Sequence, residues 1–207
     1  LVNDGWNGDC YYINGKKLTG IQIVDGYYYN FGEDGICKGQ TKYSGLFKDE
    51  TVDAYRYAIA GELQGGWVQI ENYWHYFDKT SKVAVIGEFD YEGRGITYHL
   101  DETGKTKGVW HSSEYGTRYW YGPSCYQARN IYQRNFVEID GKIYNFDKQG
   151  YLTLGIHALY DDWTSTIRGE MNVWEFDENG VLVSQITGTG IVGNKNENMY
   201  LIEDDGF

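Results

Sequence analysis

The sequence predicts an all-β fold, a solenoid of stacked two-stranded β-hairpins, and three observations lead to that prediction. The chain has 207 residues, and its 21 Tyr, 7 Trp and 8 Phe must supply most of the buried area. A twelve-residue segment occurs in three copies, and a short turn motif recurs along the chain. Repetition of this kind is typical of units that each stack on the next.

The repeated segment predicts two short strands. Residues 66–77 align without a gap on residues 20–31 and on residues 135–146. The second half of each copy is an aromatic run of the Tyr-x-Phe or Tyr-x-Ile kind. Alternation with a period of two is the pattern of a strand with one buried face.

A polar turn follows the aromatic run. The pattern Asp-x-x-Gly occurs at residues 101–104, 147–150 and 177–180, with variants at 31–35 and 202–206, and the copy at residues 77–81 has lost its glycine. The Asp side chain accepts backbone bonds and the glycine adopts positive φ, so this turn is expected to close a hairpin with the strands. One hairpin is marginal in water, so each needs a neighbour that covers its aromatic face.

The turn spacing divides one continuous array into units. Asp78 and Asp101 are 23 residues apart (101 − 78), whereas Asp101 and Asp147 are 46 apart (147 − 101), so a degenerate copy is expected in the longer gap. The approximate units are 1–20, 21–39, 40–65, 66–87, 88–109, 110–134, 135–155, 156–190 and a truncated 191–207. Residues 49–63 have a helical composition, but the alignment of their tail on residues 11–20 favours a hairpin with at most a short helical turn.

The charge balance excludes several classes of partner. With 18 Lys and Arg against 30 Asp and Glu, the net charge is −12, which disfavours nucleic acid and anionic membrane surfaces. No run of 18 apolar residues occurs, and residues 1–20 lack the pattern of a signal peptide. We therefore expect a soluble chain without membrane insertion, whose export signal has been removed or lies upstream in a longer parent.

No cofactor, metal site or disulfide framework is expected. Cys10, Cys37 and Cys125 are odd in number and form no Cys-x-x-Cys pair, so buried thiols are expected, with a Cys10–Cys37 bridge left open. The acidic groups at residues 161–162 and 203–205 are interpreted as hydrated edges rather than calcium sites.

The chain itself is not expected to be an enzyme. Its four histidines lack metal-ligand spacing, and no Gly-x-Ser-x-Gly elbow occurs. Most carboxylates fall at solvated turns, where nothing raises the pKa as a general acid requires. His75 and His99 are interpreted as aromatic substitutes for the strand positions that Tyr29 and Tyr144 fill in other copies.

The repeated residues carry a family resemblance. The stretch Gly66-Trp67-x6-Trp74-His75-Tyr76-Phe77-Asp78 resembles the cell-wall-binding repeats of Gram-positive surface proteins. That family includes choline-binding repeats, the glucan-binding repeats of glucosyltransferases and related repeats of large clostridial toxins. The resemblance covers roughly Gly5 to Gly206. It implies the hairpin solenoid, whereas the ligand differs between branches of the family.

The choline-binding branch implies one candidate site. In that branch two tryptophans and an aromatic residue of the next unit surround a trimethylammonium group, and a cation over an indole gains roughly 0.5 to 2 kcal/mol. Only the copy at residues 66–77 keeps both tryptophans, Trp67 and Trp74. The third position falls on Thr97, with Tyr98 beside it, so a full choline-binding array is not expected.

A glycan ligand demands less, because sugar rings present apolar C–H faces that stack on Trp or Tyr. Weak sites repeated along one array add through effective concentration. The alternative for each aromatic residue is that it only packs hairpin against hairpin. The candidate ligand-binding residues are Trp67, Trp74, Tyr76, Tyr98, Tyr28, Trp110, Trp120 and Tyr121.

The expected function is non-catalytic attachment. The chain is interpreted as a module of a secreted or surface-attached bacterial protein that binds cell-wall polysaccharide, glucan or choline-bearing teichoic acid outside the cell. The alternatives are a toxin-like or adhesin-like repeat region that binds host glycan or protein, and a structural spacer. Dimerisation and a catalytic domain elsewhere in a longer parent stay open.

Overall fold

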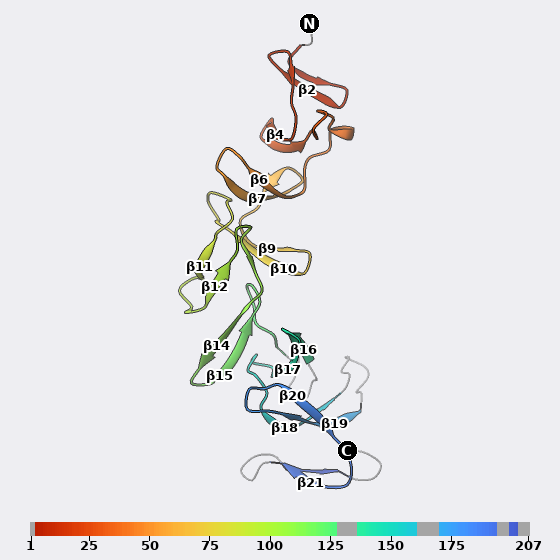
Figure 1. Ribbon diagram of the computed structural model, residues 1–207, viewed down its shortest axis with the longest axis vertical. Coiled ribbons are helices and arrows are strands. Elements are labelled where there is room, and N and C mark those ends of the chain that lie inside the picture. Colours follow the sequence, from red (N-terminus) through yellow and green to blue (C-terminus); the bar gives the residue numbers. More distant parts are fainter. Residues whose placement is uncertain (1–2, 128–135, 161–169, 194–198, 203–207) are drawn as a thin grey trace. The chain divides into compact units, whose positions relative to one another are not determined.

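The computed structural model describes residues 3–127, 136–160, 170–193 and 199–202, and these residues form short antiparallel sheets (Figure 1). The chain divides into two compact units, Leu1–Lys107 and Gly108–Phe207, and each is described by itself. A short 3-10 turn, η1 (Lys38–Gln40), is the only helical element in the described part of the chain. The predicted all-β class is confirmed.

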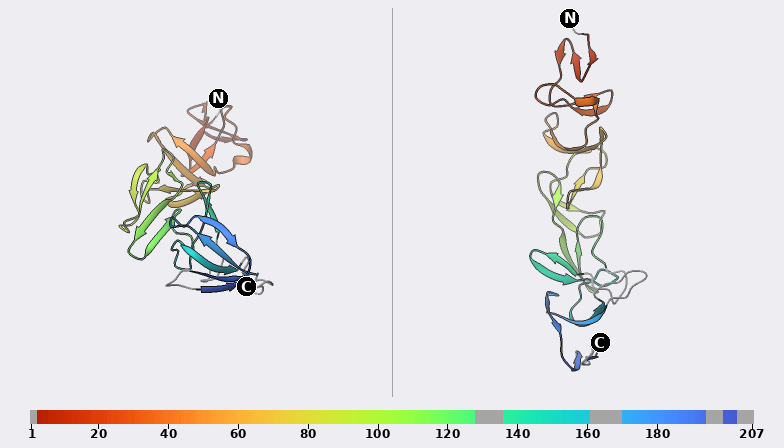
Figure 2. Two further views of the ribbon diagram at one scale, coloured as in Figure 1. Left: turned by 60° about the horizontal axis from the view of Figure 1, so that its bottom comes forward. Right: turned by 90° about the vertical axis from the view of Figure 1, so that its right-hand side faces the viewer.

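The first unit contains five sheets (Figures 1 and 2). They are formed by β1 (Gly5–Asn7), β2 (Cys10–Ile13) and β3 (Lys16–Lys17); by β4 (Ile21–Val24) and β5 (Tyr27–Asn30); by β6 (Gly45–Asp49), β7 (Ala54–Ile59) and β8 (Glu62–Leu63); by β9 (Gly66–Ile70), β10 (Tyr73–Phe77) and β13 (Lys105–Thr106); and by β11 (Gly87–Asp90) and β12 (Thr97–Leu100).

The second unit contains four sheets. They are formed by β14 (Val109–Ser113) and β15 (Gly116–Trp120); by β16 (Phe136–Ile139) and β17 (Lys142–Asn145); by β18 (Gly155–Tyr160), β19 (Met171–Phe176) and β20 (Leu182–Ile186); and by β21 (Gly190–Gly193) and β22 (Met199–Ile202). The hairpin expected within residues 49–63 is formed by β7 and β8, with no helix there.

Several hairpins are closed by a two-residue tip. Asp25 (φ 50°) and Gly26 (φ 84°) both have positive φ, and the same holds for Asp140 (φ 50°) and Gly141 (φ 76°). Two successive positive-φ residues define the type I′ turn, whose twist matches that of the flanking strands. The expectation that Asp-x-x-Gly closes these hairpins is therefore wrong for β4–β5 and β16–β17, because an Asp-Gly pair already supplies the geometry the tip needs, whereas it holds for the antiparallel pair β19–β20, which the turn at residues 177–180 joins.

The Asp-x-x-Gly turn instead comes after the second strand. The Asp147 carboxylate accepts the backbone N–H groups of Gln149 and Tyr151, each at 2.8 Å. The chain then reverses, so that Phe146 pairs with Leu152. Asp177 makes the corresponding bonds between β19 and β20, and its bond to the Val181 N–H is 2.8 Å long. The motif thus leads the chain from one hairpin into a further short strand.

Aromatic side chains join successive hairpins within each unit. In the first unit, Phe31 and Val24 pack with Trp6 and Tyr11 of the preceding hairpin. The next contact places Tyr28 of β5 with its ring centroid 5.0 Å from that of Phe47 in β6.

In the second unit, aromatic side chains also join successive hairpins. Tyr119 of β15 shares a core with Tyr144 and Phe146 of the next hairpin. Phe136 of β16 then packs on Trp174 and Phe176 of β19. Each hairpin thus covers part of the aromatic face of its neighbour, while the division into units along a single array stays a prediction.

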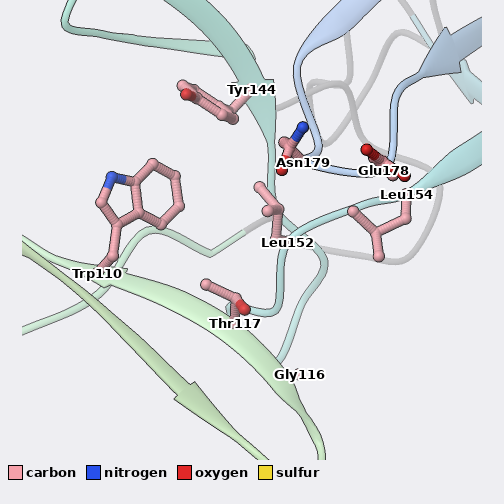
Figure 3. Close-up of a pocket in the computed structure, with 8 residues that line it drawn as sticks. All are labelled: Trp110, Gly116, Thr117, Tyr144, Leu152, Leu154, Glu178 and Asn179. Carbon is pink, nitrogen blue, oxygen red and sulfur yellow. The ribbon is translucent and has the colours of Figure 1, made fainter.

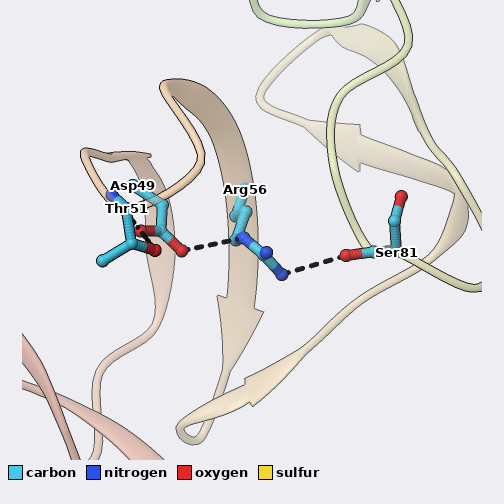
Figure 4. A network of polar contacts seen from close by, with 4 residues as sticks. All are labelled: Asp49, Thr51, Arg56 and Ser81. Atoms are coloured by element: carbon cyan, nitrogen blue, oxygen red, sulfur yellow. Dashed lines mark hydrogen bonds and ion pairs between the residues drawn. The ribbon is translucent and has the colours of Figure 1, made fainter.

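A polar network also crosses between hairpins in the first unit (Figure 4). The Arg56 Nε atom lies 2.9 Å from Asp49 Oδ2, and both side chains are largely buried, with 13% and 10% exposed. The Arg56 guanidinium also donates a hydrogen bond through Nη1, 3.0 Å long, to the carbonyl of Ser81 in the turn after β10. One arginine therefore connects the β6–β7 hairpin to the hairpin that follows.

The three cysteines carry free thiols, so the bridge left open between Cys10 and Cys37 is not formed. Burial raises the pKa of the Cys37 thiol, which donates to the carbonyl of Thr41. Burial likewise raises the pKa of the Cys125 thiol. Among the described residues, no helix is both long and apolar enough to cross a membrane, and no group of His, Cys, Asp or Glu is arranged to hold a metal ion.

Candidate functional site

The second unit contains an open cleft of about 300 Å³ beside Trp110 (Figure 3). Trp110 comes from β14, Thr117 from β15 and Tyr144 from β17. The turn between β19 and β20 supplies polar groups. The described residues that line the cleft are Trp110, Gly116, Thr117, Tyr144, Leu152, Leu154, Glu178 and Asn179.

Aromatic rings form one side of the cleft. The Trp110 ring centroid lies 4.9 Å from those of Tyr119 and Tyr144, in edge-to-face geometry. Tyr119 and Tyr144 are buried, whereas 37% of Trp110 is exposed. The indole is therefore held by buried neighbours while part of its surface stays open to solvent, which is the condition for stacking on an external ring.

Polar groups lie across from the indole. Figure 3 shows Trp110 and Thr117 on one side of the cleft, with Asn179 and Glu178 on the other. Within the part of the chain that the structure describes, the side chains of Glu178 and Asn179 are exposed and make no ion pair or side-chain hydrogen bond. A carboxylate accepts hydrogen bonds and an amide both donates and accepts, so the two groups together suit hydroxyl partners.

Local geometry fixes the position of these two side chains. The Asp177 carboxylate accepts the Asn179 N–H at 2.9 Å, and Gly180 N–H donates to the Asp177 carbonyl at 3.0 Å. A Cβ atom on Gly180 would lie 2.4 Å from Cγ of Leu152, so this glycine permits a close approach of the turn to the cleft wall. The turn motif thereby places Glu178 and Asn179 beside Leu152.

Four predicted site residues meet in the first unit around Trp67. Its ring centroid lies 6.4 Å from Trp74, 5.1 Å from Tyr76 and 4.9 Å from Tyr98, all in edge contacts. Phe89 and Tyr91 of the following hairpin segment also belong to the cluster, although no repeat motif had pointed to them. Tyr76 and Tyr98 are buried. Rings of the same chain therefore surround the Trp67 indole.

The other predicted site residues neither line the Trp110 cleft nor contact the Trp67 ring. Tyr28 is buried, and burial followed by the nearby Asp49 charge raises its pKa. Tyr121 stacks on Tyr126 at 4.2 Å, and Trp120 pairs with Val109 across its hairpin. Of the predicted set, only Trp110 lines the cleft.

Sequence reasoning missed most of the cleft. Tyr144 stands in the repeat alignment and Glu178 in a turn motif, so both carried a structural signal and no functional one. Only contact between hairpins shows that they share a cleft with Trp110.

The two histidines assigned to aromatic positions differ. His75 is 4% exposed and its ring lies parallel to Phe77 with centroids 6.4 Å apart, as an aromatic substitute requires. His99 is exposed, so that interpretation is wrong for His99, because its side chain projects from the opposite face of β12 to the buried Tyr98 and Leu100.

Comparison with known proteins gives one sequence relative. No family model matches the chain. Glucosyltransferase-S of Streptococcus mutans is 29% identical over 158 residues, which is 74% of this chain and 10% of that protein. The chain therefore spans about a tenth of the length of this relative. The match confirms the resemblance drawn from the repeated residues, which includes repeats of glucosyltransferases.

Solved structures with similar arrangements were also found. Choline binding protein F from Streptococcus pneumoniae is 20% identical, with 92% of this chain and 60% of that chain covered and a TM-score of 0.36. Alternansucrase in complex with isomaltononaose is 19% identical, with 95% of this chain and 15% of that chain covered and a TM-score of 0.37.

Proposed function

We propose that this chain is a non-catalytic carbohydrate-binding module of a secreted or surface-attached bacterial protein. The observation that carries the proposal is the Trp110 cleft, where an open indole faces polar side chains. Sequence similarity to a glucosyltransferase over 158 residues supports the same class of ligand. The proposed ligands are a cell-wall polysaccharide or a glucan.

The cleft has the physical properties of a weak sugar site. Trp110 offers a face for the C–H surface of a sugar ring, and an edge contact with Tyr144 holds the indole in place. Thr117, Glu178 and Asn179 are placed to bond ring hydroxyls. A shallow site of this size gives modest affinity, so attachment gains from several weak sites on one chain.

The array supplies that multiplicity in our proposal. Within each unit, successive hairpins are joined by aromatic contacts, and we extend this rule to a solenoid of stacked hairpins along the whole chain. Such a module would attach a longer extracellular parent, with or without a catalytic domain, to a polymer at the cell surface.

A choline-bearing teichoic acid is a second class of ligand. Trp67 and Trp74 supply two indoles of one hairpin, and Tyr98 of the following hairpin lies 4.9 Å from Trp67. The net charge of −12 favours a cationic headgroup. A glycan is favoured over choline here because the chain's own rings surround Trp67.

The Trp67 cluster also favours a second function, that of a structural spacer. If all aromatic rows are used in packing as they are around Trp67, the chain would hold other domains apart without binding a polymer. The spacer role predicts no retention on any polysaccharide.

A pull-down distinguishes these functions. The chain is incubated with purified cell wall, with wall stripped of choline and teichoic acid, and with insoluble α-glucan. We expect retention on stripped wall or α-glucan and loss of most retention in Trp110→Ala. Tyr115→Ala is the matched control, because Tyr115 is 73% exposed at the tip of the same hairpin and does not line the cleft.

Three results would contradict the proposal. Equal retention of Trp110→Ala and the parent chain would show that the cleft does not bind the polymer. Absence of retention on all three polymers would favour the spacer. Release of soluble sugar from any of them by the isolated chain would contradict the non-catalytic role.

A further inference from the structure

The Trp110 cleft contains an acidic side chain. Among the described residues that line the cleft, Glu178 is the only charged one. The carboxylate of Glu178 has no ion-pair partner among the residues that the structure describes. A ligand that enters the cleft therefore meets one uncompensated carboxylate.

A second acidic residue, Asp177, adds to the negative charge beside Glu178. Asp177 precedes Glu178 in the same turn, and its carboxylate is engaged by the backbone N–H groups of Asn179 and Val181. Backbone bonds hold Asp177 in place, and the described residues give its carboxylate no ion-pair partner. The two acids therefore place negative charge in the turn that contributes Glu178 to the cleft.

The aromatic side of the cleft also favours positively charged ligand groups over negatively charged ones. The face of an indole is the negative part of its quadrupole, so it attracts cationic and C–H groups rather than anions. The exposed surface of Trp110 and the carboxylate of Glu178 line the same cleft. A ligand group held between them is stabilised if it is positive and destabilised if it is negative.

We infer that the Trp110 cleft selects sugars that carry a free, protonated amino group over neutral sugars, and neutral sugars over uronic acids, with Glu178 as the specificity-determining residue. This inference rests on the proposed function and names its ligand class. Exposed charge pairs contribute little each, so we expect a preference of about two- to fivefold for the amino sugar at low ionic strength.

A matched series of oligosaccharides tests this inference. The three probes share the β-1,4 linkage and are hexamers of glucosamine, glucose and glucuronate. Binding is followed on the full chain labelled with ¹⁵N-tryptophan, from the indole N–H resonance of Trp110, which Trp110→Phe identifies. The titrations are made at a pH at which the sugar amine is protonated, first at low salt and then at about 0.5 M salt, where the Debye length falls below about 5 Å.

The expected order of affinity is glucosamine, glucose, glucuronate, with a smaller spread at high salt. Glu178→Gln should bring the three affinities together, whatever the affinity that remains for the glucose hexamer. Glu102→Gln is the matched control, because Glu102 holds the same position in the turn at residues 101–104 of the first unit. The preference of Glu102→Gln for the glucosamine hexamer should equal that of the parent chain.

Three results would overturn the inference. They are an unchanged preference in Glu178→Gln, glucuronate binding as tightly as glucosamine, and no shift of the Trp110 resonance with any hexamer. Because the proposed function is decided by the polymer pull-down and Trp110→Ala, retention there combined with any of these results would leave carbohydrate binding in place and remove only the charge preference.

Discussion

At the scale of single residues, Trp67 and Trp110 have the same chemistry and different surroundings. Five aromatic rings of the same chain lie within 6.4 Å of the Trp67 centroid. Trp110 has three ring neighbours and keeps 37% of its surface exposed. We therefore propose that the first indole mainly stabilises the fold and that the second is available to a ligand.

Replacement of Trp67 by alanine tests this difference. We expect Trp67→Ala to lower the free energy of unfolding by about 3 to 5 kcal/mol, because a large ring is lost from a packed cluster. Urea unfolding followed by far-UV circular dichroism gives the measurement. Tyr115→Ala, at a 73% exposed site, should change it by less than about 0.5 kcal/mol. Similar values for the two variants would contradict a packing role for Trp67.

His75 makes the stability of the first unit depend on pH. Burial lowers the pKa of His75, and the Lys105 charge acts in the same direction, whereas a bond to the Tyr73 backbone and the charges of Asp101 and Glu71 oppose the shift. The unfolded chain binds a proton on this histidine below about pH 6.5, whereas the folded chain resists it. The free energy of unfolding is therefore constant above that pH and falls as the pH drops below it.

His75→Tyr should remove this part of the pH dependence, because tyrosine fills the equivalent position at Tyr29 and Tyr144 and does not titrate there. The measurement is the urea midpoint at about pH 5 and pH 7.5. The parent chain should lose more stability between the two than His75→Tyr does. The control is His99→Gln at an exposed site, which should behave as the parent chain. Equal losses for the parent chain and His75→Tyr would rule out His75 as the cause.

At the scale of elements, polar contacts decide how one hairpin meets the next. The Arg56 guanidinium is shared between Asp49 in its own hairpin and the Ser81 carbonyl in the next turn (Figure 4). Both charged side chains are close to nine-tenths buried. Removing either one leaves the other charge buried without an ion-pair partner, with only the hydrogen bonds from Thr51 to Asp49 or from Arg56 to the Ser81 carbonyl remaining.

The Arg56 contact predicts a strongly non-additive pair of substitutions. Arg56→Met should cost about 3 kcal/mol of unfolding free energy, because it strands the Asp49 carboxylate. Asp49→Asn combined with Arg56→Met should cost less than Arg56→Met alone. Chemical denaturation of the three proteins gives the comparison. A double variant that is as unstable as the sum of the single changes would mean that the two residues act independently.

At the scale of the whole molecule, the chain forms two compact units, Leu1–Lys107 and Gly108–Phe207. The Trp67 cluster lies in the first unit and the Trp110 cleft in the second. All contacts that define each site come from its own unit. The two sites are therefore expected to work separately.

Expression of the two halves as fragments tests this separation. The fragment of residues 108–207 should unfold cooperatively and retain carbohydrate binding within about threefold of that of the intact chain, after allowance for lost multivalency on polymers. Short oligosaccharides avoid that complication. Near-UV circular dichroism reports whether aromatic packing survives. A fragment that is folded but does not bind would show that the first unit contributes to the cleft.

The sequence by itself determined the all-β class, the strand-forming repeats and the Asp-x-x-Gly turns, because these depend on residues close together in the chain. Alternation sets which face of a strand is buried, and Asp and Gly set local backbone geometry. Residues 49–63 were assigned correctly for the same reason, since repeat alignment outweighs their helical composition.

Tertiary structure alone decided which aromatic residues stay open. Trp67 was predicted as a ligand-binding residue from its own hairpin, but Phe89, Tyr91 and Tyr98 arrive from a later segment and surround it. Trp110 is left exposed because the turn that carries Glu178 lies across from it and not upon it. Exposure of an aromatic ring depends on how neighbouring hairpins stack, and the residues of a single repeat do not specify that contact.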